Sequence, residues 1–295
     1  PLIVKASAGG GGKGMRVVQS EEALENAILT AQSEAKSAFG NESVYLEKYF
    51  EEPKHIEFQI LGDIKGNVVS FPERDCSIQR RHQKLIEESP SQISPKLRKK
   101  MGHYARLAAK SVDYFTAGTI EFLVDKKENF YFMEMNTRIQ VEHPVTELVS
   151  GIDIVKEQIR LAYGELIGYG YDDIVINGHA IECRINAEDP DKGFIPSPGR
   201  IESIIFPGGP GVRLDTHIYD GYTVPSSYDS LIAKLLVIDS NRGKAITKMQ
   251  RALSEFEISG IKTTISFHKM VMANDYFKSG DIYTNFIQNR IYGEK

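Results

Sequence analysis

The stretch that most constrains the fold runs from Tyr131 to Pro144, because polar and apolar residues alternate along it with the two-residue period of a β-strand. The polar positions on one face are Glu134, Asn136, Arg138, Gln140 and Glu142. A solvated edge strand is the ordinary explanation of such alternation. A solvated face, however, usually carries Lys, Thr and Glu in no fixed arrangement. Two carboxylates, two amides and a guanidinium in so short a stretch indicate a site that handles a metal, an anion and a proton.

A β-hairpin is expected to bring this strand against the one before it, Gly118 to Val124. With polar residues 125–129 as the turn, Val124 pairs with Tyr131 and Glu121 lies opposite Glu134. Directly opposed residues have Cβ atoms about 5 Å apart, where like charges repel. A register slip of one residue is the alternative, and it would send the two glutamates to opposite faces of the sheet.

A hard divalent cation between Glu121 and Glu134 would remove this repulsion. Asn136, two residues along the same face, offers a further oxygen donor. The hairpin therefore predicts a metal site formed by Glu121, Glu134 and Asn136.

Length and charge narrow the class of protein. A chain of 295 residues suits one large or two medium domains, and 40 acidic against 36 basic residues give a net charge of −4. Nothing in this balance indicates nucleic acid or an anionic membrane as a partner. Cys76 and Cys183 lie far apart without metal-ligand spacing, which favours a reducing compartment, so we expect a cytoplasmic protein without a membrane span. Because Pro1 opens directly on an apolar strand, we expect that an N-terminal portion is missing.

The first segment, 3–18, reads as a strand, a glycine-rich loop and a second strand. A G-x-G-x-x-G pattern begins at Gly9, but a dinucleotide-binding loop must lead into a helix and Met15 to Val18 look extended. Lys13 is followed by glycine, which excludes a Walker A loop. The remaining interpretation is a flap whose backbone N–H groups hold phosphate, assisted by Lys5, and which becomes ordered when nucleotide binds. A flexible linker without a ligand is the alternative.

Further periodic segments place the other elements. Helices are expected from Ser20 to Gly40, from Ser94 to Val112, over 152–163, over 242–257 and after Ser266. Strands are expected over 44–50, 55–61 (with one buried face), 68–71, 179–186, 200–206, 212–217 and 231–238.

The run from Pro72 to Lys84 is dense in charges of both signs, which predicts an ion-pair network around an anion. Composition changes near Tyr169 to short strands with Gly and Pro turns, which predicts a domain boundary there.

Four motifs carry a resemblance to a known family. They are KASAGGGGKG from Lys5, ERDCSIQRRHQK from Glu73, EMNTRIQVEHPVTE from Glu134 and ECRINAED from Glu182. Together they resemble biotin carboxylase, a family of the ATP-grasp superfamily, over essentially the whole chain. The resemblance implies an α/β ATP-grasp domain over residues 1–168 with a lid subdomain at about 1–45. A β-rich biotin carboxylase C-terminal domain over 169–295 would follow.

The resemblance also implies roles for individual residues. Those assigned to ATP are Lys5, Gly10, Gly11, Gly12, Gly14, Met15, Glu47, Lys48, His55, Gln79, His82, Lys84, Leu123 and Glu134. Glu121, Glu134 and Asn136 would hold magnesium or manganese, in agreement with the hairpin argument. Bicarbonate would lie against Lys84, Arg138, Gln140, Val141 and Glu142, and Arg184 would face biotin. The catalytic set would be Arg138, Glu142, Lys84 and Arg184, with Glu142 as the base.

Partners follow from the same resemblance. The chain contains no Met-Lys-Met attachment site, so the biotin would be held by a separate biotin carboxyl carrier protein, alongside carboxyltransferase subunits and in a homodimer. The parent enzyme could be an acetyl-CoA carboxylase of fatty acid biosynthesis, or the pyruvate or propionyl-CoA type. The family's upstream nucleotide-fold domain, with a further ATP-contacting lysine, is absent from this sequence. Another ATP-grasp ligase, such as a carbamoyl-phosphate synthetase or a purine-pathway carboxylase, and a truncated non-catalytic nucleotide-binding chain are the alternatives.

The functional stretch itself must bend. A straight strand from Glu134 to Glu142 would separate the two carboxylates by roughly 26 Å, too far for one reaction centre. We therefore expect regular pairing to end near Asn136 or Thr137, and Arg138 to Glu142 to form a loop that returns toward the metal site. Pro144 supports this exit from the sheet, because it has no N–H to donate.

Overall fold

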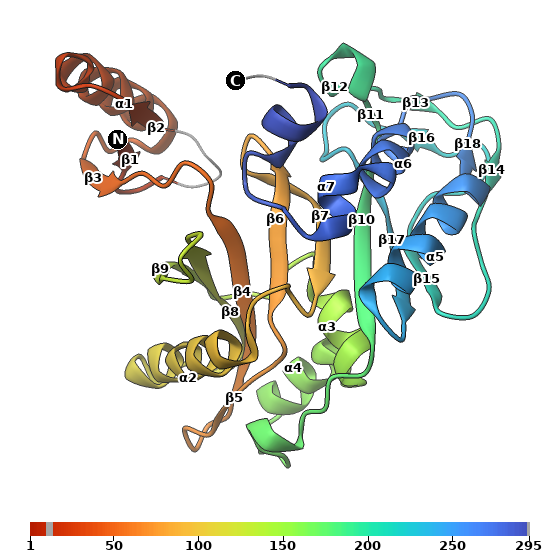
Figure 1. Cartoon of the computed structure of the whole chain (residues 1–295), viewed down its shortest axis with the longest axis horizontal. Helices are drawn as coiled ribbons and strands as arrows, with labels where there is room; N and C mark the ends of the chain where they lie inside the picture. The colour runs from red at the N-terminus through yellow and green to blue at the C-terminus, as the bar shows by residue number, and fades with distance from the viewer. Residues whose placement is uncertain (10–13, 294–295) are drawn as a thin grey trace.

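A computed structural model describes residues 1–9 and 14–293. Its largest sheet is built from β4 (Lys54–Gly62), β5 (Val68–Ser70), β6 (Arg74–Arg80), β7 (Gln83–Ser89), β8 (Thr116–Val124), β9 (Phe130–Asn136), β10 (His179–Asn186), β15 (Val212–Thr216) and β17 (Leu231–Asp239). Within the described residues these strands lie in the order β15-β17-β10-β7-β6-β4-β8-β9, with β5 beside β4, and pair antiparallel. Because β7 pairs with β10, the sheet continues across the predicted domain boundary (Figure 1).

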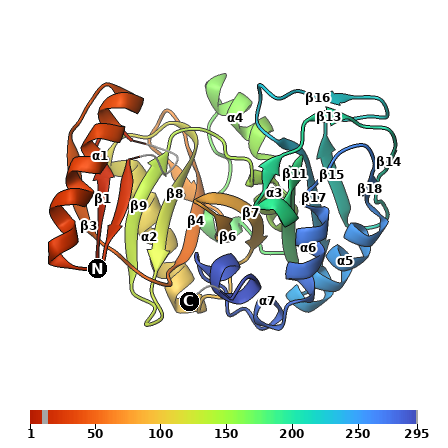
Figure 2. The same ribbon diagram turned by 90° about the horizontal axis from the view of Figure 1, so that it is seen from above.

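A small sheet of β1 (Leu2–Ala6), β2 (Met15–Val18) and β3 (Val44–Lys48) lies at the β9 end of the molecule, covered by α1 (Leu24–Phe39) (Figures 1 and 2). The two predicted strands are confirmed, and so is the helix. Ser20 precedes a short 3-10 helix, η1 (Glu21–Ala23), which leads into α1, and Gly40 ends α1 in the left-handed conformation that glycine adopts most easily. Ala31 and Ala35 are buried, which lets α1 lie close to the strands.

The remaining helices flank the large sheet. They are α2 (Pro95–Ser111), α3 (His143–Ser150), α4 (Ile154–Ala162), α5 (Arg242–Glu255), α6 (Ile265–Ala273) and α7 (Asp275–Ser279). Helix α2 packs on β4, β5 and β8, whereas α3 packs on β7, β10 and β17. Helix α5 packs on β10 and β17 at the other end of the molecule (Figure 2). No helix of the described chain is both long and apolar enough to cross a membrane.

The part after β10 contains short elements. The strands are β11 (Glu188–Asp189), β12 (Ile195–Pro196), β13 (Gly199–Arg200), β14 (Ile204–Ile205), β16 (Thr223–Val224) and β18 (Glu257–Ile258). Single turns lie at η2 (Tyr171–Asp173), η3 (Pro190–Lys192) and η4 (Ile287–Ile291), the last a π-helix. The one strand expected over 200–206 is therefore two short pieces that pair with different partners.

Two further features differ from the sequence analysis. Strand β4 was expected to bury one face, but His55, Glu57 and Gln59 are buried as well as the apolar residues between them. The polar side chains on that second face have partners on other strands, since His55 contacts Glu121 while Glu57 and Gln59 accept from Arg74. Helix α3 was not predicted either. Strand pairing already ends at Asn136, and Pro144 stands in the first turn of α3, where its missing N–H costs nothing.

Candidate active site

The β8–β9 hairpin places Glu121 opposite Glu134, as the sequence predicts. The pairing next to the turn differs, however, since Val124 pairs with Phe130 and not with Tyr131. A β-bulge between Glu121 and Phe122 absorbs the difference, and it leaves Met133 as the extra residue of β9. Without this bulge, Glu134 would point to the other face of the sheet.

The three predicted metal residues converge at this bulge. Nδ2 of Asn136 donates to Oε1 of Glu121 at 2.8 Å and to Oε1 of Glu134 at 3.2 Å. Glu121 is buried and Glu134 is exposed, so the cluster opens to solvent on one side. Two facing carboxylates and an amide, whose oxygen a half-turn would present, suit a hard divalent cation. These residues therefore fit a magnesium ion in their chemistry.

Lys84, at the start of β7, joins three buried carboxylates. Its Nζ lies 2.6 Å from Oε2 of Glu57, 3.1 Å from Oε1 of Glu121 and 2.6 Å from Oε1 of Glu142. Burial alone would lower the pKa of Lys84, but Glu57 and its neighbours raise that pKa well above its usual value. The ammonium therefore keeps its charge inside the protein.

The loop after β9 curls back as predicted. Regular pairing ends at Asn136, and residues 137–142 form irregular structure before α3. Gln140 donates to Oε1 of Glu121 at 2.6 Å, while Glu142 is buried. Because both carboxylates contact Lys84 Nζ, at 3.1 and 2.6 Å, Glu142 and Glu121 are within about 6 Å of each other. Arg138 remains exposed and donates to the carbonyl of Ile139 at 3.2 Å.

Glu142 lies between two cations that come from different strands. Lys84 binds its Oε1, and Nη2 of Arg184, on β10, lies 2.9 Å from its Oε2. Burial and Glu57 raise the pKa of Glu142, but Lys84, Arg184 and Arg74 together hold that pKa below its ordinary value. Glu142 is therefore an ionised carboxylate that can accept a proton.

Arg74 and Glu57 were not predicted as site residues. Arg74 is fully buried, and its Nε lies 2.5 Å from Oε1 of Glu57. Its guanidinium also donates to Gln59, Thr119, Gln140 and Thr146 at 2.9 to 3.1 Å. The sequence did contain a signal for both residues, because Arg74 lies in the charge-dense run from Pro72 to Lys84 and Glu57 shares a strand face with His55. The ion-pair network expected around that run is present, with carboxylates as its anions.

Most of the residues predicted to bind nucleotide come from the small sheet and from strands of the large sheet. Nε2 of His55 is 2.5 Å from Oε2 of Glu121, and Gln79 lies 3.4 Å from Nδ1 of His55. Lys5 forms an ion pair with Glu47 at 2.5 Å. Burial lowers the pKa of His82, and the nearby charge of Lys5 lowers it further. The remaining positions are Met15 opposite Lys5, Leu123 opposite His55, Lys48 over the ring of Phe50, and Gly14 with φ +70°. Gly10, Gly11 and Gly12 lie outside the described residues.

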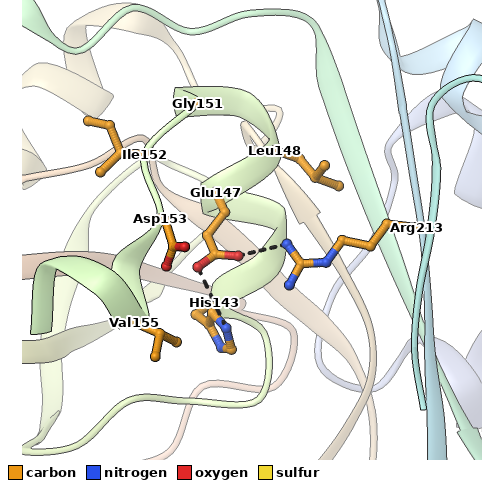
Figure 3. A pocket seen from close by; sticks show the side chains of 8 residues that line it. All are labelled: His143, Glu147, Leu148, Gly151, Ile152, Asp153, Val155 and Arg213. Carbon is orange, nitrogen blue, oxygen red and sulfur yellow. Dashed lines mark hydrogen bonds and ion pairs between the residues drawn. The ribbon is translucent and has the colours of Figure 1, made fainter. Parts of the chain in front are cut away.

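A cavity of about 560 Å³ lies beside α3 (Figure 3). Its lining residues are His143, Glu147, Leu148, Gly151, Ile152, Asp153, Val155 and Arg213. Glu147 bridges His143 and Arg213, with its Oε2 2.7 Å from Nη1 of Arg213. This cavity contains none of the predicted nucleotide, bicarbonate or biotin residues.

Comparison with known proteins identifies the family. Residues 1–168 match the family described as the carbamoyl-phosphate synthase L chain, ATP binding domain, and residues 182–289 match the biotin carboxylase C-terminal domain. Biotin carboxylase from Nostoc sp. is 57% identical over 289 residues, which are 98% of this chain and 65% of that protein. A pyruvate carboxylase subunit from Methanothermobacter thermautotrophicus is 56% identical, over 97% of this chain and 58% of that protein.

A solved structure adds ligands to the comparison. The biotin carboxylase domain dimer of the Hydrogenobacter thermophilus 2-oxoglutarate carboxylase, in complex with MgADP, ADP and bicarbonate, superposes with a TM-score of 0.96 at 51% identity. The superposition covers 100% of this chain and 65% of that one. The chain thus spans about two thirds or less of the relatives it matches. The chain belongs to the biotin carboxylase family, with an ATP-grasp domain followed by the family's C-terminal domain.

Proposed function

We propose that this chain forms the larger part of an ATP-dependent ligase that carboxylates biotin on a carrier protein, with bicarbonate as the carbon source. The observation that supports this most is Glu142, a buried carboxylate held ionised between Lys84 and Arg184 and joined to Glu121 through the shared Lys84. A base in that position matches the need to deprotonate bicarbonate before it attacks a phosphoryl group. Relatives named biotin carboxylase, and a neighbour described with MgADP and bicarbonate, support the same reaction class.

The residues divide between two chemical steps. In the first, Glu142 accepts the bicarbonate proton while bicarbonate oxygen attacks the terminal phosphorus of ATP and ADP leaves, which forms carboxyphosphate. Lys84 offsets the charge on the transferred phosphoryl group, and Arg138, Gln140 and the Val141 backbone hold bicarbonate. In the second step, the ureido nitrogen of biotin loses its proton, the resulting enolate forms a bond to the carboxyl carbon of carboxyphosphate, and phosphate leaves and carries the proton away. Arg184 and Arg138 stabilise the enolate, for which a planar guanidinium is well suited.

Cofactors, domains and partners belong to the same proposal. Magnesium, or manganese, would supply positive charge at the phosphate oxygens, and Glu121, Glu134 and Asn136 would hold it. ATP would bind between the lid subdomain, about 1–45, and the rest of an ATP-grasp domain over 1–168, with the C-terminal domain over 169–295. We propose a homodimer in the cytoplasm that works with a biotin carboxyl carrier protein and carboxyltransferase subunits. An acetyl-CoA carboxylase of fatty acid biosynthesis is one possible parent, and a pyruvate carboxylase another.

The test is ATP cleavage by the purified protein in the presence of magnesium. We expect phosphate release that requires bicarbonate and that free biotin stimulates. Release that needs an amine donor or a purine intermediate and ignores biotin would point to another ATP-grasp ligase. Calorimetry that shows MgATP binding without any turnover would identify a non-catalytic nucleotide-binding chain, and either result would contradict the proposal.

A further inference from the structure

A second pair of glutamates faces each other in the middle of the large sheet. Glu87 on β7 and Glu182 on β10 are direct partners in the antiparallel register. Both side chains are fully buried. Directly opposed residues have Cβ atoms about 5 Å apart, so the two carboxyl groups are neighbours on one face of the sheet.

Three of the four oxygens in this pair have no hydrogen-bond partner among the described residues: Oε2 of Glu87 and both oxygens of Glu182. The fourth, Oε1 of Glu87, lies 2.6 Å from Nε and 2.5 Å from Nη2 of Arg184. Buried acceptors without donors are costly, and two opposed buried anions are costlier still. One proton added to the pair would relieve both costs, because a protonated carboxyl becomes a donor to its neighbour.

The charges around the pair favour Glu182 as the holder of that proton. Burial and Glu87 raise the pKa of Glu182 well above its ordinary value, with Lys234 and Arg184 opposing and Glu142 adding to the rise. Lys234 is directed elsewhere, since its Nζ donates to the Val141 carbonyl at 3.1 Å and lies 3.6 Å from Asp215. Glu87 has Arg184 on its first oxygen, so it is the better anion of the two.

We infer that Glu182 is a positioning residue: as a neutral carboxylic acid it donates a hydrogen bond to Oε2 of Glu87 and so fixes the carboxylate that orients Arg184. Arg184 then reaches Glu142 with Nη2 at 2.9 Å, so the alignment of the proposed base and of the proposed biotin-facing cation depends on a side chain that touches neither substrate. This inference rests on the function proposed above for Arg184 and Glu142. Glu182 therefore acts on Arg184 through Glu87, which lies between them.

Two variants separate this role from simple core packing. Glu182→Gln keeps the shape and an N–H donor for Glu87, whereas Glu182→Met keeps the length and removes the donor. We expect Glu182→Gln to stay within about threefold of the wild-type kcat for biotin-dependent ATP cleavage. Glu182→Met should lower that kcat by roughly tenfold or more and raise the KM for biotin, because a hydrogen bond to a charged group is lost, while the KM for ATP is unchanged. Glu188 is also buried, and its carboxylate accepts a hydrogen bond from Ser230, so Glu188→Gln is the matched control. This variant should change neither the kcat nor the KM for biotin.

Infrared difference spectroscopy tests the proton itself and does not require turnover. At neutral pH the wild-type spectrum should contain a protonated-carboxyl stretch that Glu182→Gln lacks and Glu188→Gln retains. A wild-type protein without that band, or a folded Glu182→Met with wild-type kcat and biotin KM, would overturn the inference. If biotin never stimulates the wild-type protein, the proposed function fails, whereas the infrared band still decides whether Glu182 is neutral.

Discussion

Two pairs of glutamates face each other across neighbouring strands of one sheet, and their surroundings shift the pKa values of Glu121 and Glu182 in opposite directions. Glu121 and Glu134 lie near the β9 edge, where Lys84, His55, Gln140 and Asn136 all contact Glu121. Burial raises the pKa of Glu121, but His55 and Lys84 hold that pKa far below its usual range. Glu87 and Glu182 lie in the middle of the sheet, and burial dominates there, raising the pKa of Glu182 well above its ordinary value against the opposing charges of Lys234 and Arg184.

The difference shows that opposed carboxylates do not by themselves specify a metal site. Donors decide the outcome, since a carboxylate that accepts several hydrogen bonds stays charged, whereas one with none retains its proton. The first pair also opens to solvent through Glu134, so an ion can enter. The second pair is closed, which suits a fixed structural proton.

The largest expected effect comes from Lys84→Met, which removes the cation beside the first pair. It leaves Glu57, Glu121 and Glu142 without their shared ammonium, and we expect a loss of about 3–5 kcal/mol in the free energy of unfolding at pH 7. Depressed carboxylate pKa values stabilise the wild type above the unfolded value of 4.5, so the difference should shrink as the pH falls below about 4.5. Urea unfolding at pH 7 and at about pH 3, which lies well inside this window, measures both effects. A loss below about 1 kcal/mol at pH 7 would contradict the account.

A smaller effect is expected from Glu134→Gln, which should raise the magnesium concentration needed for half-maximal ATP cleavage by roughly tenfold or more. Glu121→Gln should do the same and also lower stability, because Glu121 is buried among cations whereas Glu134 is exposed. Glu87→Gln, from the other pair, should leave the magnesium requirement unchanged. An unchanged requirement in both Glu121→Gln and Glu134→Gln would remove the metal assignment.

The last expected effect is a change in how stability depends on pH. A carboxyl whose folded pKa is raised stabilises the protein below its unfolded pKa of 4.5, and that contribution falls as the pH rises toward the folded value. Removing one such group with Glu182→Gln should make the decline between pH 5 and pH 8 less steep by up to about 1.4 kcal/mol per pH unit. Urea unfolding across that range, with Glu188→Gln as control, measures the slopes. Parallel curves for wild type and Glu182→Gln would show that Glu182 is charged in the folded state.

The sequence could reveal the first pair because a hairpin is a local structure. Counting from the turn placed Glu121 opposite Glu134, and a bulge at Met133 compensated for an error of one residue next to the turn. A bulge has no reliable sequence signature. The predicted pairing of Glu121 with Glu134 was therefore correct only because the unpredicted bulge cancelled the error in register next to the turn. The bend after Asn136 followed from distance alone, because one reaction centre cannot span a straight strand of that length.

The second pair could not be found in this way. Strands β7 and β10 are separated by α2, the β8–β9 hairpin, α3 and α4, and no count from a turn fixes the register between them. The same limit explains why Arg74 was missed, since its partners Glu57, Thr119, Gln140 and Thr146 come from four separate segments. Local periodicity predicts elements and faces, whereas buried ion pairs depend on which distant strands become neighbours.

The most direct test of the central claim is the rate of carboxybiotin formation from labelled bicarbonate in the wild type and in Glu142→Gln, with the dissociation constant for MgATP measured on the same samples. Because Glu142 is proposed to accept the bicarbonate proton, the variant should lose roughly 10²- to 10⁴-fold in rate while its affinity for MgATP stays close to that of the wild type. A Glu142→Gln variant that carboxylates biotin at the wild-type rate would contradict the account.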